Sequence, residues 1–276
     1  MKHLGVLMLV AGLLIGCTHV SSEKVGETSP PGQEILERQP LPPLPDTIRP
    51  SFEPLTMNEL QKGEPSPEWQ LRQSIPFGQI GPSEGMLHIY EASSPDELLS
   101  SSVHGILSLP GGEYLLRDLS RSFLEQRQPG CDEVCLFQRV LPGQERVELI
   151  GSIELFANGP GLHANVVDDR DERKLQVFDN WGQVVFVDLD QDGSDELIIQ
   201  FQGLHNSPPD VFFIRATEGV LEKSESVVTA LGRNSWDFAR LEQERTPPVI
   251  SIGNVWTEAE LVYAYTYRQG VLERVP

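Results

Sequence analysis

Basic residues are scarce in this sequence. It has 21 lysines and arginines against 41 aspartates and glutamates, so the formal net charge is −20 at pH 7. A surface of this sign repels the phosphates of nucleic acids and the anionic headgroups of lipids. The composition therefore argues against a nucleic-acid partner. It suits cationic partners, or divalent metal ions held by clustered carboxylates, and plain solubility is the alternative explanation of the excess charge.

The sequence also lacks the motifs of several enzyme classes. It contains no nucleophile elbow, no phosphate-binding loop and no metalloprotease helix. No segment reaches 18 consecutive apolar residues, so we expect no membrane-spanning helix. Hydrophobic residues make up 39% of the chain, which is enough to form the core of a folded domain.

The first 17 residues have the pattern of an export signal. A short basic start at residues 1–3 precedes an apolar run at residues 4–15, which is too short to span a bilayer. The run ends in Leu14-Ile15-Gly16-Cys17, which resembles the lipobox of bacterial lipoproteins. The resemblance implies that residues 1–16 are a signal peptide and that Cys17 carries diacylglycerol, often with a further acyl chain such as palmitate. An ordinary secretory signal with an incidental cysteine is the alternative.

The lipobox resemblance also implies a location. Two or three acyl chains attach a protein stably to a membrane, whereas a single chain does not. The protein is then expected in the cell envelope, anchored by lipid and facing the periplasm or the exterior. Because Thr18 and not Asp follows Cys17, the outer membrane is favoured if the source is Gram-negative.

Residues 17–67 are expected to form a lipidated, proline-rich linker. Ten of the 22 prolines lie between Pro30 and Pro67. Proline lacks the backbone N–H that helices and sheets use, and it favours extended geometry in the residue before it. The segment is therefore expected to be a disordered, semi-rigid spacer, whose section from Pro30 to Pro67 could reach about 100 Å.

Residues 68–276 are expected to form one mainly β domain. Short apolar runs alternate with Gly, Pro, Asn and Asp at intervals typical of strands and turns. The predicted strands are residues 86–91, 105–109, 134–141, 147–155, 175–178, 184–187, 197–201, 211–215, 249–252, 261–268 and 271–275. Helices are expected only at residues 116–126 and 236–243.

One internal similarity bears on the architecture. Gly219-Val220-Leu221-Glu222-Lys223 recurs 51 residues later as Gly270-Val271-Leu272-Glu273-Arg274. Repeats of roughly this period are typical of propeller blades, each with four strands. The domain is therefore expected to be either a small or incomplete β-propeller-like fold or a β-sandwich.

The most informative motif lies between two predicted strands. Asp188, Asp190 and Asp192 occupy positions 1, 3 and 5 of a loop, followed by Gly193. Calcium takes six to eight oxygen ligands, and alternating carboxylates around a tight glycine turn can converge on it. Ser194 would add its backbone carbonyl, and Glu196 closes the loop at position 9.

The position of the closing carboxylate decides which calcium loop this is. An EF-hand needs a glutamate at position 12 and flanking helices, whereas position 12 here is Ile199 in an apolar run. The motif instead resembles the loops of FG-GAP and VCBS-type repeats. In that family the carboxylates at positions 1, 3, 5 and 9 bind calcium. These positions correspond to Asp188, Asp190, Asp192 and Glu196, although the family commonly has Asp at position 9.

Three weaker features remain. Cys131 and Cys135 enclose three residues, and in an exported protein they are expected to form a disulfide. Asp168, Asp169, Asp171 and Glu172 form a second acidic cluster, expected to be a solvated hairpin loop because it lacks a turn glycine and contains two arginines. Trp181, Trp236 and Trp256 are expected in the core, with a sugar-binding face as the alternative.

These features together predict a non-enzymatic envelope lipoprotein. Its calcium-stabilised β domain would serve in binding or structural interactions, with a protein or a glycan as partner. The alternative is an envelope hydrolase acting on glycan, with structural calcium and a pair of catalytic carboxylates.

Overall fold

The computed structural model describes residues 42–80, 83–93, 101–125, 134–233, 236–256 and 261–275. The signal peptide, Cys17 and Cys131 lie outside these residues. Residues 41–276 form one compact unit. No helix of the described part is long and apolar enough to cross a membrane.

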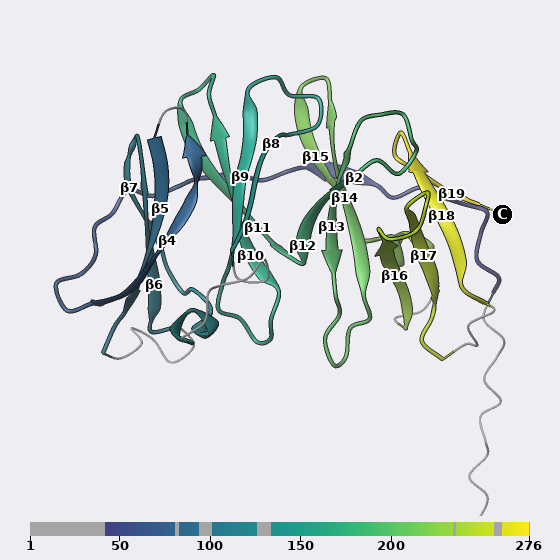
Figure 1. Ribbon diagram of the computed structural model, residues 1–276. Helices are drawn as coiled ribbons and strands as arrows, with labels where there is room; N and C mark the ends of the chain where they lie inside the picture. Colours follow the sequence, from purple (N-terminus) through teal and green to yellow (C-terminus); the bar gives the residue numbers. More distant parts are fainter. Residues whose placement is uncertain are drawn as a thin grey trace, which may run out of the picture. The chain divides into compact units, whose positions relative to one another are not determined.

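The unit is mainly β, as the sequence predicts, and its strands form four antiparallel sheets without a closed barrel among the described residues. Each sheet contains four strands consecutive in the chain, hydrogen-bonded in chain order (Figure 1). Sheet 1 contains β4 (Gln70–Ile80), β5 (Ser83–Glu91), β6 (Val103–Leu109) and β7 (Gly112–Leu116), and sheet 2 contains β8 (Val134–Val140), β9 (Val147–Glu154), β10 (Leu162–Asp169) and β11 (Lys174–Trp181). Sheet 3 contains β12 (Gln183–Val187), β13 (Glu196–Phe201), β14 (Asp210–Thr217) and β15 (Val220–Ser224), and sheet 4 contains β16 (Asp237–Glu242), β17 (Val249–Asn254), β18 (Tyr263–Arg268) and β19 (Val271–Arg274).

The segment before β4 joins all four sheets. Three short strands, β1 (Thr47–Ile48), β2 (Phe52–Pro54) and β3 (Asn58–Glu59), pair with β19, β15 and β11 in turn. Lys62 then forms an isolated bridge with Tyr114 of β7. We call residues 47–62 the strap, because they add an edge strand or a bridge to each sheet.

The sequence predicts a disordered spacer that extends to Pro67, but the structure shows that the strap is folded. From Pro42 onward this segment belongs to the folded unit. Proline is tolerated in edge strands, where one side of the strand needs no hydrogen-bonding partner. Pro54 accordingly lies in β2, at the edge of sheet 3. The extended geometry that proline favours is thus used for strand pairing.

Three hydrophobic clusters fill the spaces between successive sheets. Sheets 1 and 2 meet around Phe77 and Ile153, and sheets 2 and 3 meet around Phe178 and Leu197. Between sheets 3 and 4, the ring of Phe213 stacks on that of Tyr267 with centroids 3.9 Å apart.

The inner sheets are buried on both faces, which explains an irregular feature of the sequence. In β13, Leu197 and Ile199 face sheet 2, whereas Ile198 faces sheet 4. A strand covered on both faces is apolar throughout, and one covered on a single face alternates. The unbroken run from Leu197 to Ile199 therefore reflects the position of sheet 3 between two neighbours.

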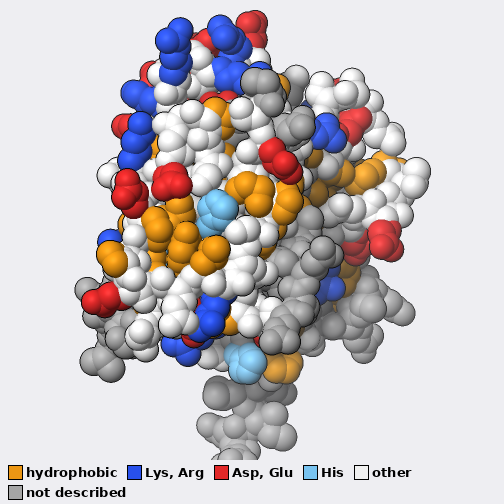
Figure 2. Space-filling model, turned by 60° about the vertical axis from the view of Figure 1, so that its left-hand side comes forward, with side chains coloured by type: hydrophobic (Ala, Val, Ile, Leu, Met, Phe, Trp, Pro, Cys, Tyr) orange, Lys and Arg blue, Asp and Glu red, His pale blue; other side chains and the backbone are white. Residues whose placement is uncertain are grey.

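The outer face of sheet 1 has no such neighbour among the described residues. On this side of the molecule hydrophobic side chains gather around a histidine (Figure 2). His88 of β5 lies on this face, with its Nδ1 atom 2.7 Å from Ser74 Oγ. Leu87 and Ile89, on either side of it, point to the core.

Both predicted helices are corrected by the structure. Residues 236–243 contain strand β16, in which Asp237, Ala239 and Leu241 are buried in alternation. In the described residues 116–125, Leu116 ends β7 and the one helical element is the 3₁₀ turn η1 (Arg121–Leu124). The one α-helix described, α1 (Val227–Leu231), was not predicted. It is capped by Ser226, whose hydroxyl accepts the N–H of Thr229, and by left-handed Gly232.

Candidate metal centre

The acidic loop connects β12 to β13 at one end of sheet 3. Val187 and Glu196 are paired across the two strands, so no helix flanks the loop and the exclusion of an EF-hand is confirmed. Gln191 and Gly193 have positive φ angles of 60° and 90°. Glycine adopts such angles without strain, which is why the tight turn falls at Gly193. Leu189 is only 1% exposed and lies in the core between sheets 3 and 4, so it fixes the loop to the fold.

Three of the predicted ligands converge. Carboxylate oxygens of Asp188, Asp190 and Glu196 all lie within 4.8 Å of one another. Oxygens bound to calcium lie about 2.4 Å from the ion, so two of them on opposite sides of it are about 4.8 Å apart. The spacing of the three carboxylates therefore fits a shared calcium ion.

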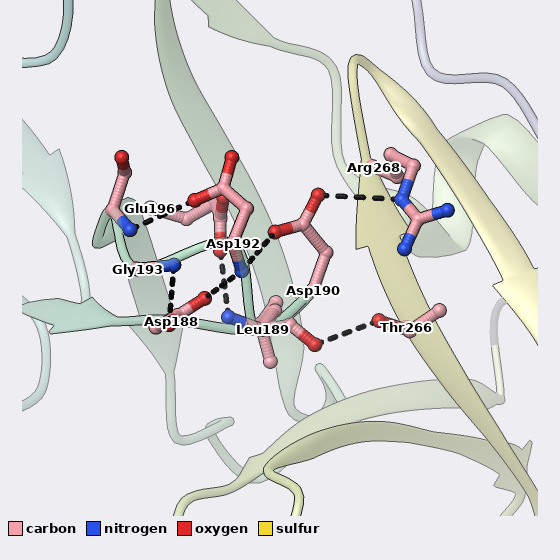
Figure 3. A network of polar contacts seen from close by, with 9 residues as sticks. Asp188, Leu189, Asp190, Asp192, Gly193, Glu196, Thr266 and Arg268 are labelled. Atoms are coloured by element: carbon pink, nitrogen blue, oxygen red, sulfur yellow. Dashed lines mark hydrogen bonds and ion pairs between the residues drawn. The ribbon is translucent and has the colours of Figure 1, made fainter.

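Backbone N–H groups of the loop orient these carboxylates (Figure 3). Asp188 accepts a hydrogen bond on Oδ1 from Asp192 N (3.1 Å) and one on Oδ2 from Gly193 N (3.0 Å). Glu196 Oε2 accepts the N–H of Leu189 at 2.7 Å. The chain itself thus holds the negative charges together.

The other two predicted ligands lie at the rim of the loop. Asp192 and Ser194 are exposed, and Asp192 Oδ1 accepts the N–H of Ser194 at 2.8 Å. The neighbouring Asp195 forms an ion pair with Arg139 of β8, Oδ2 to Nη1, at 3.1 Å.

Close packing of the carboxylates has an electrostatic cost. Burial raises the pKa of Glu196 to about 7, the N–H of Leu189 opposes the rise, and the charges of Asp190, Asp188 and Asp192 add to it. A bound cation would remove the repulsion and favour the ionised carboxylate. A divalent cation bound among these carboxylates would therefore offset their mutual repulsion.

Neighbours from two other sheets contact the loop, and the sequence gives no sign of them. Thr266 of β18 donates its hydroxyl to the carbonyl of Leu189 at 2.8 Å, and Arg268 Nε lies 3.4 Å from Asp190 Oδ2 (Figure 3). Arg139 contributes the contact from sheet 2. The loop thus lies where sheets 2, 3 and 4 come together.

The second acidic cluster is a hairpin turn between β10 and β11, as predicted. Asp169 Oδ1 accepts the N–H groups of Asp171 and Glu172, at 3.1 and 3.0 Å. Arg146 pairs with Asp171, and Lys174 with Glu172. These carboxylates are neutralised by surface cations and do not converge.

The remaining predictions have mixed outcomes. Cys135 is disulfide-bonded, and the other two cysteines of the chain lie outside the described residues. Trp181 is partly buried, but Trp236 and Trp256 are 36% and 60% exposed, so their predicted place in the core is wrong.

A cavity of about 530 Å³ lies at the opposite end of sheet 3 from the acidic loop. Its lining includes Glu154, Phe156, His163 and Phe201. Glu154 Oε2 accepts the hydroxyl of Ser122 at 3.1 Å. Glu154 is the one carboxylate among the described residues that line this cavity.

Comparisons with known proteins add no relative. No protein-family model, no curated protein and no solved structure matches the chain.

Proposed function

We propose that this protein is a lipid-anchored protein of the bacterial cell envelope whose β domain is stabilised by calcium and serves in binding or structural interactions. One observation carries the calcium part of this proposal. Oxygens of three carboxylates that repel one another are held within 4.8 Å on a loop of sheet 3 that also contacts sheets 2 and 4.

Calcium is the cation that suits this donor set. The available ligands are carboxylate and carbonyl oxygens, without thiolates or imidazoles, and calcium is a hard cation that accepts six or more oxygens. Asp188, Asp190 and Glu196 would bind it directly, while Asp192, the carbonyl of Ser194 and water would complete the shell. The resemblance to FG-GAP and VCBS-type loops supports the same assignment.

For the architecture we infer an incomplete β-propeller in which each sheet is a blade. The two similar pentapeptides support this inference, because they begin at the equivalent turns β14–β15 and β18–β19. In both turns a non-glycine residue with positive φ, Glu218 or Gln269, precedes the glycine. The strap pairs with the strand that follows each turn.

The anchor is proposed from the lipobox alone. Cys17 would carry the lipid after removal of residues 1–16, and Thr18 favours the outer membrane in a Gram-negative source. The protein would then meet its partner, another protein or a glycan, outside the cytoplasm.

Calorimetric titration of residues 17–276 with calcium tests the central claim. Asp188→Asn and Asp190→Asn each replace a charged ligand by an isosteric neutral one, and both are expected to abolish or greatly weaken the binding heat. Asp171→Asn, at the exposed turn between β10 and β11, is the matched control and is expected to bind as the wild type does. Absence of binding heat in the wild type would refute the calcium site.

The cavity favours a second candidate, an envelope hydrolase acting on glycan. Glu154 could serve as an acid or base there, but glycoside hydrolysis ordinarily uses two carboxylates. The described lining supplies one, and for this reason a binding role is preferred. Release of reducing ends from cell-wall glycan by the wild type, abolished in Glu154→Gln, would reverse this preference.

A further inference from the structure

Four exposed apolar residues gather at one end of sheet 4. Trp236 precedes β16, Val255 and Trp256 follow β17, and Leu261 precedes β18. The two indole rings meet edge to face, with centroids 5.5 Å apart. We call these four residues the tryptophan end. It lies opposite the β18–β19 turn, because antiparallel β16 and β18 begin where β17 ends (Figure 1).

The tryptophan end stands on a buried polar base. Asp237, which is fully buried, pairs with Arg233, Oδ2 to Nε, at 3.3 Å and accepts the amide of Asn254 at 2.9 Å. The backbone N–H of Trp256 in turn donates to Asn254 Oδ1 at 3.0 Å. The exposed rings are thus presented from a defined position.

The chain enters the domain at this same end. The hydroxyl of Tyr265 donates to the carbonyl of Pro45 at 2.7 Å, and Arg274 pairs with Asp46 at 3.3 Å. β1 begins beside the end of β19, three strand spacings from β17. At about 4.8 Å per spacing, the entry point lies roughly 15 Å from the tryptophan end.

Little chain separates this entry point from Cys17. The described residues begin at Pro42, and 25 residues lie from Cys17 to residue 41. Their fully extended length is at most about 90 Å. A lipid on Cys17 would therefore attach the domain through the end that carries the tryptophans, and it would keep that end within about 90 Å of the bilayer.

We propose that the tryptophan end docks on the surface of the bilayer that holds the lipid anchor. This inference rests on the anchor of the proposed function. Indole rings are favoured at the boundary between headgroups and acyl chains, where one edge is apolar and the other is wet. The arginines described at this end, Arg233 and Arg274, are each paired with an aspartate. The contact is therefore apolar and independent of anionic lipid.

The test couples residues 17–276 to liposomes through the thiol of Cys17 and a maleimide lipid. The liposomes consist of zwitterionic phosphatidylcholine with brominated acyl chains, and the bromine atoms quench the fluorescence of nearby indole rings. Two variants separate the four tryptophans. With Trp69→Phe and Trp181→Phe combined, fluorescence from Trp236 and Trp256 is expected to fall by at least half on coupling. With Trp236→Phe and Trp256→Phe combined, coupling is expected to leave the fluorescence unchanged.

A charge placed in the contact gives a second readout. In the background that lacks Trp69 and Trp181, Trp256→Glu is expected to abolish the quenching of Trp236. Val220→Glu is the matched control. Val220 is 53% exposed at the β14–β15 turn of sheet 3, at the end of the domain opposite to the tryptophans, and the variant is expected to leave quenching intact. Quenching is also expected to persist in 1 M salt.

Unquenched Trp236 and Trp256 in the coupled protein would overturn the inference. So would quenching that requires anionic lipid, or shielding of these rings from a soluble quencher by cell-wall glycan or an envelope protein instead of by liposomes. Chemical coupling makes this test independent of natural lipidation, which a Cys17→Ser variant tests in cells. Failure of the anchor and failure of the docking surface are thus distinguishable.

Discussion

Removal of calcium should lower the thermal stability of the domain by a measurable amount. A ligand that binds only the folded state adds RT ln(1 + [L]/Kd), which is about 2.7 kcal/mol when the free ligand is at a hundredfold excess over Kd. In a domain of this size each kcal/mol changes the melting temperature by about 2–4 °C. Chelation is therefore expected to lower Tm by roughly 5–11 °C.

The location of the loop makes this effect global. Leu189 lies in the core between sheets 3 and 4, and Asp195 and Asp190 pair with arginines of sheets 2 and 4. Repulsion among metal-free carboxylates would thus act on the contacts of three sheets.

The assay is a thermal melt followed by circular dichroism, with calcium and then with excess chelator. Asp190→Asn should melt at the same temperature in both conditions. The variant lacks one charged ligand for calcium, and the repulsion among the remaining carboxylates of the loop is weaker. Asp171→Asn should retain the full shift. A wild-type Tm unaffected by chelation, at calcium concentrations far above any measured Kd, would contradict the reasoning.

Four further predictions concern single side chains. Leu189→Ala should reduce the free energy of unfolding by about 2–5 kcal/mol in chemical denaturation, because it leaves a cavity in the core between sheets 3 and 4. Arg268→Gln removes a cation 3.4 Å from Asp190 and should strengthen calcium binding by up to about fivefold in a titration, since exposed ion pairs contribute at most about 1 kcal/mol; unchanged or weaker binding would contradict this. Burial raises the pKa of Asp210, so between its ordinary and its raised pKa the folded state binds the extra proton and stability falls as pH rises. Asp210→Asn should remove this pH dependence and keep an acceptor for the N–H groups of Val211 and Val228, whereas Asp210→Ala should cost about 1–3 kcal/mol. Cys17→Ser should move the protein from the membrane to the soluble fraction or leave its precursor uncut; unchanged membrane extraction would refute lipidation.

The strands that could be predicted are those whose burial follows local sequence. In β5, for example, buried Leu87 and Ile89 alternate with partly exposed Met86 and His88, and this pattern appears directly in the sequence. The segment that forms β16 was predicted as a helix. Its buried face includes Asp237, which is paired with Arg233, so the sequence lacks the apolar alternation of a strand there. The strap was missed because its strands are two or three residues long and depend on edges formed much later in the chain.

The residues around the acidic loop also fall into two groups, those that the sequence could predict and those that it could not. Asp188, Asp190 and Glu196 could be identified as candidate ligands because they lie within nine consecutive residues, and the backbone of the turn brings them together. Arg139, Thr266 and Arg268 could not, since they are separated from the loop by about 50 to 80 residues. Only the packing of the sheets brings them close.

The arrangement of the sheets shows why the strap and the loop matter together. Each hydrophobic cluster lies between two successive sheets, so apolar packing alone couples a sheet to its immediate neighbours. When units contact only their neighbours, local unfolding can spread from an end without disrupting the whole. The strap crosses every boundary between sheets, and the loop at the end of sheet 3 also contacts sheets 2 and 4. The proposed metal binding and the strap pairing would therefore both increase the cooperativity of unfolding. Calcium removal should accordingly increase hydrogen exchange first in β2 and only later in sheet 1. β2 pairs with β15 of sheet 3, which carries the loop, whereas sheet 2 separates sheet 1 from sheet 3.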